Sequence, residues 1–340
     1  MSQETSKWLN TMTLIGCTDQ RGMAWHYRES DQGDEPNHYP GFIPVDDVLR
    51  RLFNFEVTPQ PIFTTNPVTG EMEAIEGKIA NVCSDNGNVL GIFSDSYEGH
   101  SYRQWLLENI STILDDDLGI ANAVLLKNRA VAMVQVEVPD SFSTADGVQF
   151  RPNLMAATSY DGSLSTTYKR TVTNIVCDNT MMVGLSEKGQ QYRLKHTKNS
   201  GLRLAEAREA LNIIYSTADD FTAQVNMLTS TKVSEAQWAK VLNALNPIPE
   251  EDGRGQTVAL QKRGSLQFLW KEDARIGEFK GTAWGVVQAF NTYNQHFTSS
   301  RKAHRAERGF LNALTGKTET ADNLVMGALS SVLDKQLVLA

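Results

Sequence analysis

The sequence lacks the features that mark membrane proteins, secreted proteins and the commonest enzyme classes. No apolar run approaches the roughly 20 residues that a helix needs to cross a bilayer. The first residues, M-S-Q-E-T-S-K-W, contain no basic start followed by an apolar segment, so no secretory signal is expected. Nucleophile elbows, phosphate-binding loops, dinucleotide fingerprints and paired metal-binding histidines are also missing. The sequence thus predicts a cytoplasmic protein without a membrane span. It favours a non-catalytic role and leaves an enzyme open.

Cysteine is scarce, and its placement argues against disulfide and zinc sites. Cys17, Cys83 and Cys177 are odd in number and far apart, which is typical of reduced, buried thiols in a cytoplasmic protein. A structural zinc site needs a clustered pair of ligands, and the sequence has none. The three adjacent carboxylates of residues 115–117 diverge along the chain, so they predict a solvated loop. We expect no metal and no cofactor.

The net charge of −8 is distributed unevenly along the chain. Residues 1–150 hold 9 basic and 22 acidic residues, a net charge of −13. Residues 151–340 hold 23 basic and 18 acidic residues, a net charge of +5. This asymmetry predicts two functionally different halves, of which the second could meet a polyanion. The alternative is that a solvated acidic face simply keeps the protein soluble.

The apolar pattern predicts an α+β protein in three parts. Residues 1–70 form an N-terminal arm with a short helix at 44–55, where the apolar residues share one face. Residues 71–230 form an α+β core, and residues 231–340 form a helical C-terminal region. In the core, an antiparallel sheet is expected over residues 71–197, packed by a long amphipathic helix at 202–228 whose apolar residues keep the three-four spacing.

Turn and capping signals locate the elements within these parts. Asp85-Asn86-Gly87-Asn88 and Lys127-Asn128-Arg129 each lie between alternating apolar runs, which predicts two hairpins. Ser234 and Gln237 have the spacing of a capping box at the start of a helix. Further helices are expected at 282–297 and 320–339, the second with Leu324, Leu329 and Leu333 among its inward residues, and a basic turn lies between them at Arg301–Arg308.

The stretch from Asn153 to Thr197 organises the core as three strands joined by turns. Asp161-Gly162 supplies the first turn, because glycine accepts the positive φ that hairpin turns require. In the last strand, Tyr192, Leu194 and His196 alternate with Arg193, Lys195 and Thr197. A buried histidine with one hydrogen bond is expected at His196.

Basic and aromatic residues of this stretch predict a nucleic-acid-binding surface. If the strands are neighbours, the alternation brings cations together on a face that tracks phosphates, and tyrosines offer stacking surfaces. The alternative is that exposed strands carry Lys and Arg for solubility and edge protection. Arg301–Arg308 is a second candidate patch. The predicted binding residues are Lys169, Arg170, Arg193, Lys195, Lys198, Arg203, Tyr160 and Tyr168.

An enzyme site is the weaker interpretation of the same stretch. Asp161, Ser163, Cys177, Asn179 and His196 would have to assemble in space. Each has a structural explanation: Asp161 to Ser163 form a turn, Cys177 packs in the core, and Asn179 satisfies a strand end. No catalytic residue is therefore assigned.

Five segments carry a family resemblance: S-Y-D-G-S (159–163), V-C-D-N-T (176–180), K-H-T (195–197), V-L-G-I-F-S-D-S-Y (89–97) and T-A-W-G-V-V-Q-A-F-N-T-Y-N-Q-H (282–296). Together they resemble the phage/plasmid-like protein family, a domain-of-unknown-function group carried by phages, prophages and plasmids. The likeness runs from about Leu90 to Leu333. Tyr160 stands where the family usually has His, and Lys195 where it has Arg. The family-motif residues are Asp161, Gly162, Ser163, Cys177, Asn179, Thr180, His196 and Thr197.

The resemblance implies a phage- or plasmid-encoded protein of the host cytoplasm. Mobile elements of this kind often carry recombination proteins, and the order of strands and long helix is broadly similar to the core of phage single-strand annealing proteins, a fold-level analogy. Our hypothesis is a homo-oligomer that binds single-stranded DNA and promotes annealing or protection in recombination or replication. The alternative is an acidic interaction or scaffold protein that engages host or phage proteins through residues 1–150.

Overall fold

The structure is a computed structural model, which describes the chain except for residues 1–2, 25–26, 113, 115–117, 139–140, 175–178, 182–190, 195–213, 275, 299–304 and 338–340. For residues 3–6, 170, 173–174, 179–181, 191–194, 214–218 and 305–306 it describes the backbone alone. The predicted solvated loop at 115–117 lies outside the described residues. Cys17 and Cys83 are buried, as predicted.

The chain divides into two compact units. Unit 1 comprises the described residues of 1–139, 154–169 and 189–212, and unit 2 comprises those of 140–153, 170–188 and 213–340. The predicted boundaries after residues 70 and 230 do not fall at these borders, so the three-part organisation stays a prediction.

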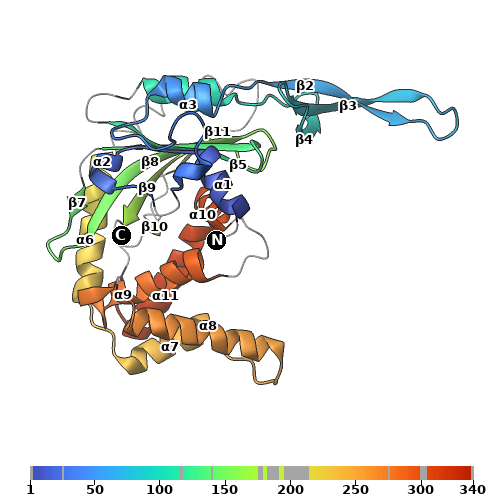
Figure 1. Ribbon diagram of the computed structural model, residues 1–340. Coiled ribbons are helices and arrows are strands. Elements are labelled where there is room, and N and C mark those ends of the chain that lie inside the picture. Colours follow the sequence, from blue (N-terminus) through green and yellow to red (C-terminus); the bar gives the residue numbers. More distant parts are fainter. Residues whose placement is uncertain are drawn as a thin grey trace. The chain divides into compact units, whose positions relative to one another are not determined.

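The α+β class is confirmed, and an antiparallel sheet is its main feature (Figure 1). Among the described residues this sheet has eight strands in the order β1-β5-β6-β8-β9-β10, with β7 on β8 and β11 on β9. The strands are β1 (Thr13–Ile15), β5 (Gly119–Leu126), β6 (Val131–Glu137), β7 (Phe142–Ser143), β8 (Gln149–Ser159), β9 (Thr166–Asn174), β10 (Asn179–Met181) and β11 (Gln191–Leu194). Both predicted hairpin partners β5 and β6 are present, joined at Lys127–Ala130.

The hairpin predicted around Asp85–Asn88 forms, but it belongs to a second sheet. β3 (Met72–Cys83) pairs with β4 (Val89–Ser94) on one side and with β2 (Val57–Thr65) on the other. The expectation of a single sheet over residues 71–197 is therefore wrong. Pro59 and Pro61 lie in β2, an edge strand, where a missing N–H does not break a ladder. Figure 1 shows the β2–β3 hairpin extending as a long two-stranded arm.

Short helices complete unit 1. They are α1 (Gln3–Thr11), α2 (Thr18–Arg21), the 3-10 turn η1 (Glu29–Asp31), α3 (Val45–Arg51), the π-helical η2 (Arg103–Glu108) and α4 (Asn109–Ser111). α3 confirms the helix predicted at 44–55, with Pro44 at its start and Val48 buried. The apolar spacing over residues 101–114 predicts an amphipathic helix, and its first part is π-helical, a geometry that is found frequently at functional sites.

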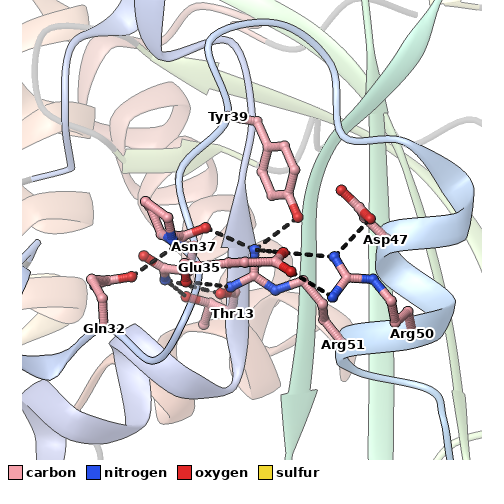
Figure 2. Close-up of polar contacts among 9 residues, drawn as sticks. Thr13, Gln32, Glu35, Asn37, Tyr39, Asp47, Arg50 and Arg51 are labelled. Atoms are coloured by element: carbon pink, nitrogen blue, oxygen red, sulfur yellow. Dashed lines mark hydrogen bonds and ion pairs between the residues drawn. The ribbon is translucent and has the colours of Figure 1, made fainter.

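A polar network ties the acidic segment before α3 to that helix (Figure 2). Both terminal nitrogens of Arg50 donate to the carboxylate of Glu35, at 2.8 and 2.6 Å, and one also donates to Asp47 at 3.0 Å. Arg51 donates to the hydroxyl of Tyr39 at 2.8 Å and to the carbonyl of Pro36 at 2.7 Å. The hydrogen bond from Arg50 lowers the pKa of Glu35. At least this end of the acidic run is therefore paired.

Unit 2 is built from helices around an aromatic core. Its helices are α6 (Ile214–Ser230), α7 (Glu235–Leu245), α8 (Arg254–Lys271), the 3-10 turn η5 (Gly277–Phe279), α9 (Ala283–Thr292), the π-helical η6 (Tyr293–Phe297), α10 (Arg305–Leu314) and α11 (Lys317–Leu333). Phe221 of α6 packs on Phe150 of β8 with ring centroids 4.6 Å apart. This contact confirms the predicted helix-on-sheet packing. The predicted capping box at Ser234 and Gln237 is present.

Three expectations for unit 2 were wrong. The basic turn predicted over Arg301–Arg308 is helical from Arg305 onward. Leu324, predicted to face inward, is exposed, and the buried residues of α11 are Asp322, Val325, Met326 and Leu329. The Pro and Gly residues of 247–256 predict a loop, but α8 begins inside this stretch, at Arg254. No helix in the described ranges is both long and apolar enough to span a bilayer.

Candidate functional site

The Asp161-Gly162-Ser163 turn is the centre of the family-motif region in unit 1. It joins β8 to β9, and the Oδ1 atom of Asp161 accepts a hydrogen bond from the backbone N–H of Ser163 at 2.9 Å. Gly162 has a φ of 68°, which an L side chain rarely adopts. The ring of Phe93 from β4 lies against this glycine. The turn therefore requires glycine both for its backbone and for space.

A second turn binds the first one through a lysine. The Nζ atom of Lys127 donates to Asp161 Oδ2 at 3.0 Å and to Ser163 Oγ at 2.9 Å. Burial of Asp161 opposes its ionisation, but the hydrogen bonds from Ser163 and Lys127 outweigh burial and lower its pKa. Asp161 is therefore a paired carboxylate, poorly suited to accept a proton near neutrality.

The Lys127 turn is itself held from two sides. Lys127, Asn128 and Arg129 have positive φ values of 47°, 50° and 74°. Arg129 forms an ion pair with Asp85, and its guanidinium lies 5.0 Å from the ring centroid of Phe55. Three consecutive left-handed residues are unusual, so these contacts must offset their strain.

Tyr160 is a core residue. Its ring centroid lies 4.3 Å from that of Tyr102, and its hydroxyl accepts a hydrogen bond from the backbone N–H of Tyr102 at 3.3 Å. Asn81 donates to the carbonyl of Tyr160 at 3.2 Å. Burial raises the pKa of Tyr160 to about 12. The tyrosine that stands in the usual place of a histidine thus anchors the turn to β3 and to the start of η2.

Tyr168 is buried in a similar way against η2. Its hydroxyl donates to the carbonyl of Trp105 at 2.7 Å and accepts from the side chain of Asn109 at 3.3 Å. Next to it, the ring of His100 stacks on Trp105 with centroids 3.7 Å apart, and its Nδ1 lies 2.6 Å from the hydroxyl of Thr166. Burial raises the pKa of Tyr168 to about 12. Its ring therefore packs inside the unit.

The members of the predicted nucleic-acid surface whose side chains the structure describes are buried. Tyr160, Tyr168 and Lys169 are only 6%, 5% and 6% exposed. The interpretation of the two tyrosines as open stacking surfaces is therefore wrong, because Tyr160 packs on Tyr102 and Tyr168 is held by the backbone of Trp105. The backbone alone is described for Arg170 and Arg193, and Lys195, Lys198 and Arg203 lie outside the described residues.

The strand register brings part of the predicted set to one face. In the antiparallel pairing of β9 with β11, residue 191 lies opposite residue 169 and residue 193 lies opposite residue 167. Positions 169 and 193 are therefore diagonal neighbours on one face of the sheet. Of the remaining family-motif residues, Asn179 and Thr180 pair with β9 through β10, while Cys177, His196 and Thr197 lie outside the described residues.

The polar contacts of unit 1 in the described ranges hold its turns together. No group of three His, Cys, Asp or Glu side chains in those ranges converges to hold a metal ion. The one ionised carboxylate at the turn is paired, and the tyrosine hydroxyls have raised pKa values. The ion pairs Arg129–Asp85 and Lys127–Asp161 link three hairpin turns to one another.

The chain matches the family described as Domain of unknown function (DUF932) over residues 89–314. The chain belongs to this family. The match covers most of the range over which the resemblance was found, including the S-Y-D-G-S turn and the 282–296 segment. A search of curated proteins and a search of solved structures found no match.

Sequence reasoning missed one polar cluster in unit 2. Asn291 of the 282–296 segment donates to the buried carboxyl of Asp322 at 3.1 Å, and Gln295 donates to Asn291 at 2.7 Å. A signal was present, because Asp322 occupies the three-four spacing of the buried stripe with Val325, Met326 and Leu329. A charged residue in an apolar stripe is a sign of a special environment.

Proposed function

We propose that this DUF932 protein is a non-catalytic protein that binds single-stranded DNA in the recombination or replication of a phage or plasmid. In this proposal cations of the β9–β11 region neutralise phosphates and hold a strand for annealing or protection. Binding of this kind is electrostatic and carries little sequence preference.

The observation that supports the proposal is the β9–β11 register. It puts positions 169 and 193, two of the predicted cations, on one face of the sheet as neighbours. The net charge of +5 over residues 151–340 supports it too. Since Lys169 is covered, we assign the phosphate contacts to Arg193 and Lys195. Since Tyr160 and Tyr168 are packed, base stacking by these tyrosines is not part of the proposal.

Fluorescence anisotropy with a labelled single-stranded oligonucleotide, titrated across salt concentrations, tests this proposal. The affinity should fall steeply with salt, with a slope of about −0.7 per phosphate contact. The Arg193→Glu/Lys195→Glu variant should bind far more weakly. The matched control is Lys240→Glu/Lys280→Glu, which changes the net charge equally at two exposed positions of unit 2. Undetectable binding at low salt, or equal losses in both variants, would reject the proposal.

A second candidate function is that of an acidic interaction or scaffold protein. The exposed surface of the β2–β3 hairpin supports it. Its exposed large apolar side chains include Phe63, Val68, Met72 and Ile75, and Val68 is 90% exposed. Exposed acids, among them Glu73, lie beside them. Isolated exposed apolar residues are ordinary, but several on one extended arm mark an interaction surface. The net positive second half of another copy is a complementary partner.

Self-association through the arm would be heterologous, because an acidic arm and a basic region are different surfaces. We expect the intact protein to be a homo-oligomer in light scattering coupled to size-exclusion chromatography. The Phe63→Ser/Met72→Ser variant should shift towards the monomer mass, while Ile248→Ser, an exposed apolar change in unit 2, should not. A monomeric wild type would exclude this assembly.

A further inference from the structure

A polar pocket of about 250 Å³ lies in unit 2. Four elements line it: α9 and η6, which contain the 282–296 motif, α10, and the first turns of α11. Side-chain amides and hydroxyls dominate its wall, and two cations, Arg308 and Lys317, join them. Apart from Arg308, which belongs to the second candidate basic patch, none of these residues was predicted to bind nucleic acid.

Asp322 supplies the buried polar group of this pocket. Its side chain is only 7% exposed, and its Oδ1 atom accepts the hydrogen bond from Asn291 at 3.1 Å. Its Oδ2 atom is buried with no hydrogen-bond partner in the described part of the chain. Buried polar atoms are nearly always paired, so an orphaned oxygen at a pocket wall points to a ligand.

The neighbours of Asp322 fix the sign of the charge that the pocket favours. α9 and η6 contribute neutral amides, from Asn291, Asn294 and Gln295. α10 contributes Arg308, which also donates to the carbonyl of Thr298 at 3.1 Å, and α11 contributes Lys317. Glu319, in the first turn of α11, is the acidic neighbour that acts on Asp322, and it is not part of the pocket lining. The N-terminus of α11 adds partial positive charge to the same wall. These groups favour an anion.

We propose that this pocket binds the phosphate group of a small ligand, with Arg308 and Lys317 neutralising it and Asp322 donating a hydrogen bond to one phosphate oxygen. The volume lies a little under the ~300–1,000 Å³ of pockets for drug-sized ligands, so a phosphate with a small organic part fits. Burial raises the pKa of Asp322 to about 7, and the carboxyl is therefore protonated in much of the protein near neutrality. A protonated carboxyl is a donor.

Isothermal titration of the full chain with sulfate and with a nucleoside 5′-monophosphate tests the site. Sulfate keeps its charge across neutral pH, so any change of its affinity with pH comes from titration of the protein and not of the ligand. Both Arg308→Gln and Lys317→Gln should weaken binding roughly tenfold or more, since each removes a charge-assisted contact. Arg254→Gln changes the net charge equally at an exposed position outside the pocket and should have no effect. Lys317 is exposed, so Lys317→Gln should fold normally and still tests the site if Arg308→Gln folds poorly.

Absence of sulfate and nucleotide binding at millimolar concentration would overturn the proposal, as would binding that neither pocket variant weakens. Competition then separates two sources of the phosphate. A 5′-phosphorylated oligonucleotide that displaces sulfate, where its 5′-hydroxyl counterpart does not, assigns the site to a strand end. Displacement by the mononucleotide alone assigns it to a small metabolite. The Arg193→Glu/Lys195→Glu variant should retain sulfate binding, so failure of either proposal leaves the other standing.

Discussion

The ring of Phe93 lies so close to Gly162 that a Cβ atom on this glycine would come within 2.7 Å of Cε1. Phe93 has little freedom to retreat, because its ring stacks on Tyr97 at a centroid distance of 3.9 Å. The S-Y-D-G-S turn and the V-L-G-I-F-S-D-S-Y segment, both parts of the family resemblance, are thus one packed unit.

Gly162→Ala should lower the free energy of unfolding by about 2 kcal/mol, from left-handed strain of roughly 1 kcal/mol and a similar cost of displacing Phe93. Gly87→Ala is the matched control. Gly87 has a φ of 71° in the β3–β4 turn, and its Cβ would meet nothing within 4 Å. Urea unfolding of the two variants should differ by the Phe93 contribution. Equal losses of unfolding free energy in the two variants would show that the Phe93 ring moves aside at no cost.

Tyr168→Phe should cost about 1–2 kcal/mol of stability, because it leaves the buried carbonyl of Trp105 without its donor. Tyr160→Phe should cost less, since its hydroxyl accepts one long bond of 3.3 Å from the backbone of Tyr102. Thermal unfolding measures both. Neither change should weaken the binding of single-stranded DNA. A Tyr168→Phe protein that is fully stable yet binds DNA poorly would restore this tyrosine to the binding surface.

The Lys127–Asp161 pair should stabilise the protein by no more than about 1 kcal/mol, since it is partly exposed. The folded-state pKa of Asp161 is lowered, so this stabilisation is present above its unfolded pKa near 3.8 and is lost as the pH falls through the lower folded value. Urea unfolding of the wild type and Asp161→Asn should differ at pH 6 and converge in strong acid. Glu108→Gln, which removes an exposed pair with Arg103, should change nothing measurable. A difference that persists unchanged at low pH would contradict the assignment.

Asp322 should make stability depend on pH in the opposite direction. Burial raises its pKa to about 7, with a smaller contribution from Glu319, while the bond from Asn291 opposes the rise. The folded state then holds a proton that the unfolded state releases above about pH 4. Stability therefore falls as the pH rises from about 4 to about 7, by on the order of 4 kcal/mol, and is level above that.

The difference in unfolding free energy between the wild type and Asp322→Asn isolates this effect, because all other titratable groups are common to both proteins. Measurements at four pH values between 4.5 and 7.5 suffice. A difference that does not change with pH would show that Asp322 titrates normally.

Features fixed by near neighbours in sequence were predictable. The Asp85–Asn88 and Lys127–Arg129 turns and the capping box of Ser234 and Gln237 are each decided within a few residues, and each is confirmed. The sheet to which each strand belongs was not predictable, because the alternation of residues along one strand does not indicate which other strand it pairs with. β1 contains three residues, too few for a periodic signal, yet it pairs with β5.

The candidate sites show that the alternation of residues along a strand does not predict their exposure to solvent. Alternation along β9 separates two faces but cannot say whether either one meets solvent, and both Tyr168 and Lys169 are buried. The predictions for Lys195 and His196 lie outside the described residues and stay predictions. Asp322 was overlooked because it lies among apolar neighbours, where an acidic residue was not sought.

The tip of the β2–β3 hairpin has a practical use. Val68 and Thr69 lie in an exposed turn, closed by the hydrogen bond from Gly70 N to the carbonyl of Asn66 at 2.9 Å, far along the strand from the buried end of β3 at Cys83. Exposed turns of this kind tolerate inserted sequence. A short tag or a single dye-bearing residue placed there would report on the protein in cells without entering its core.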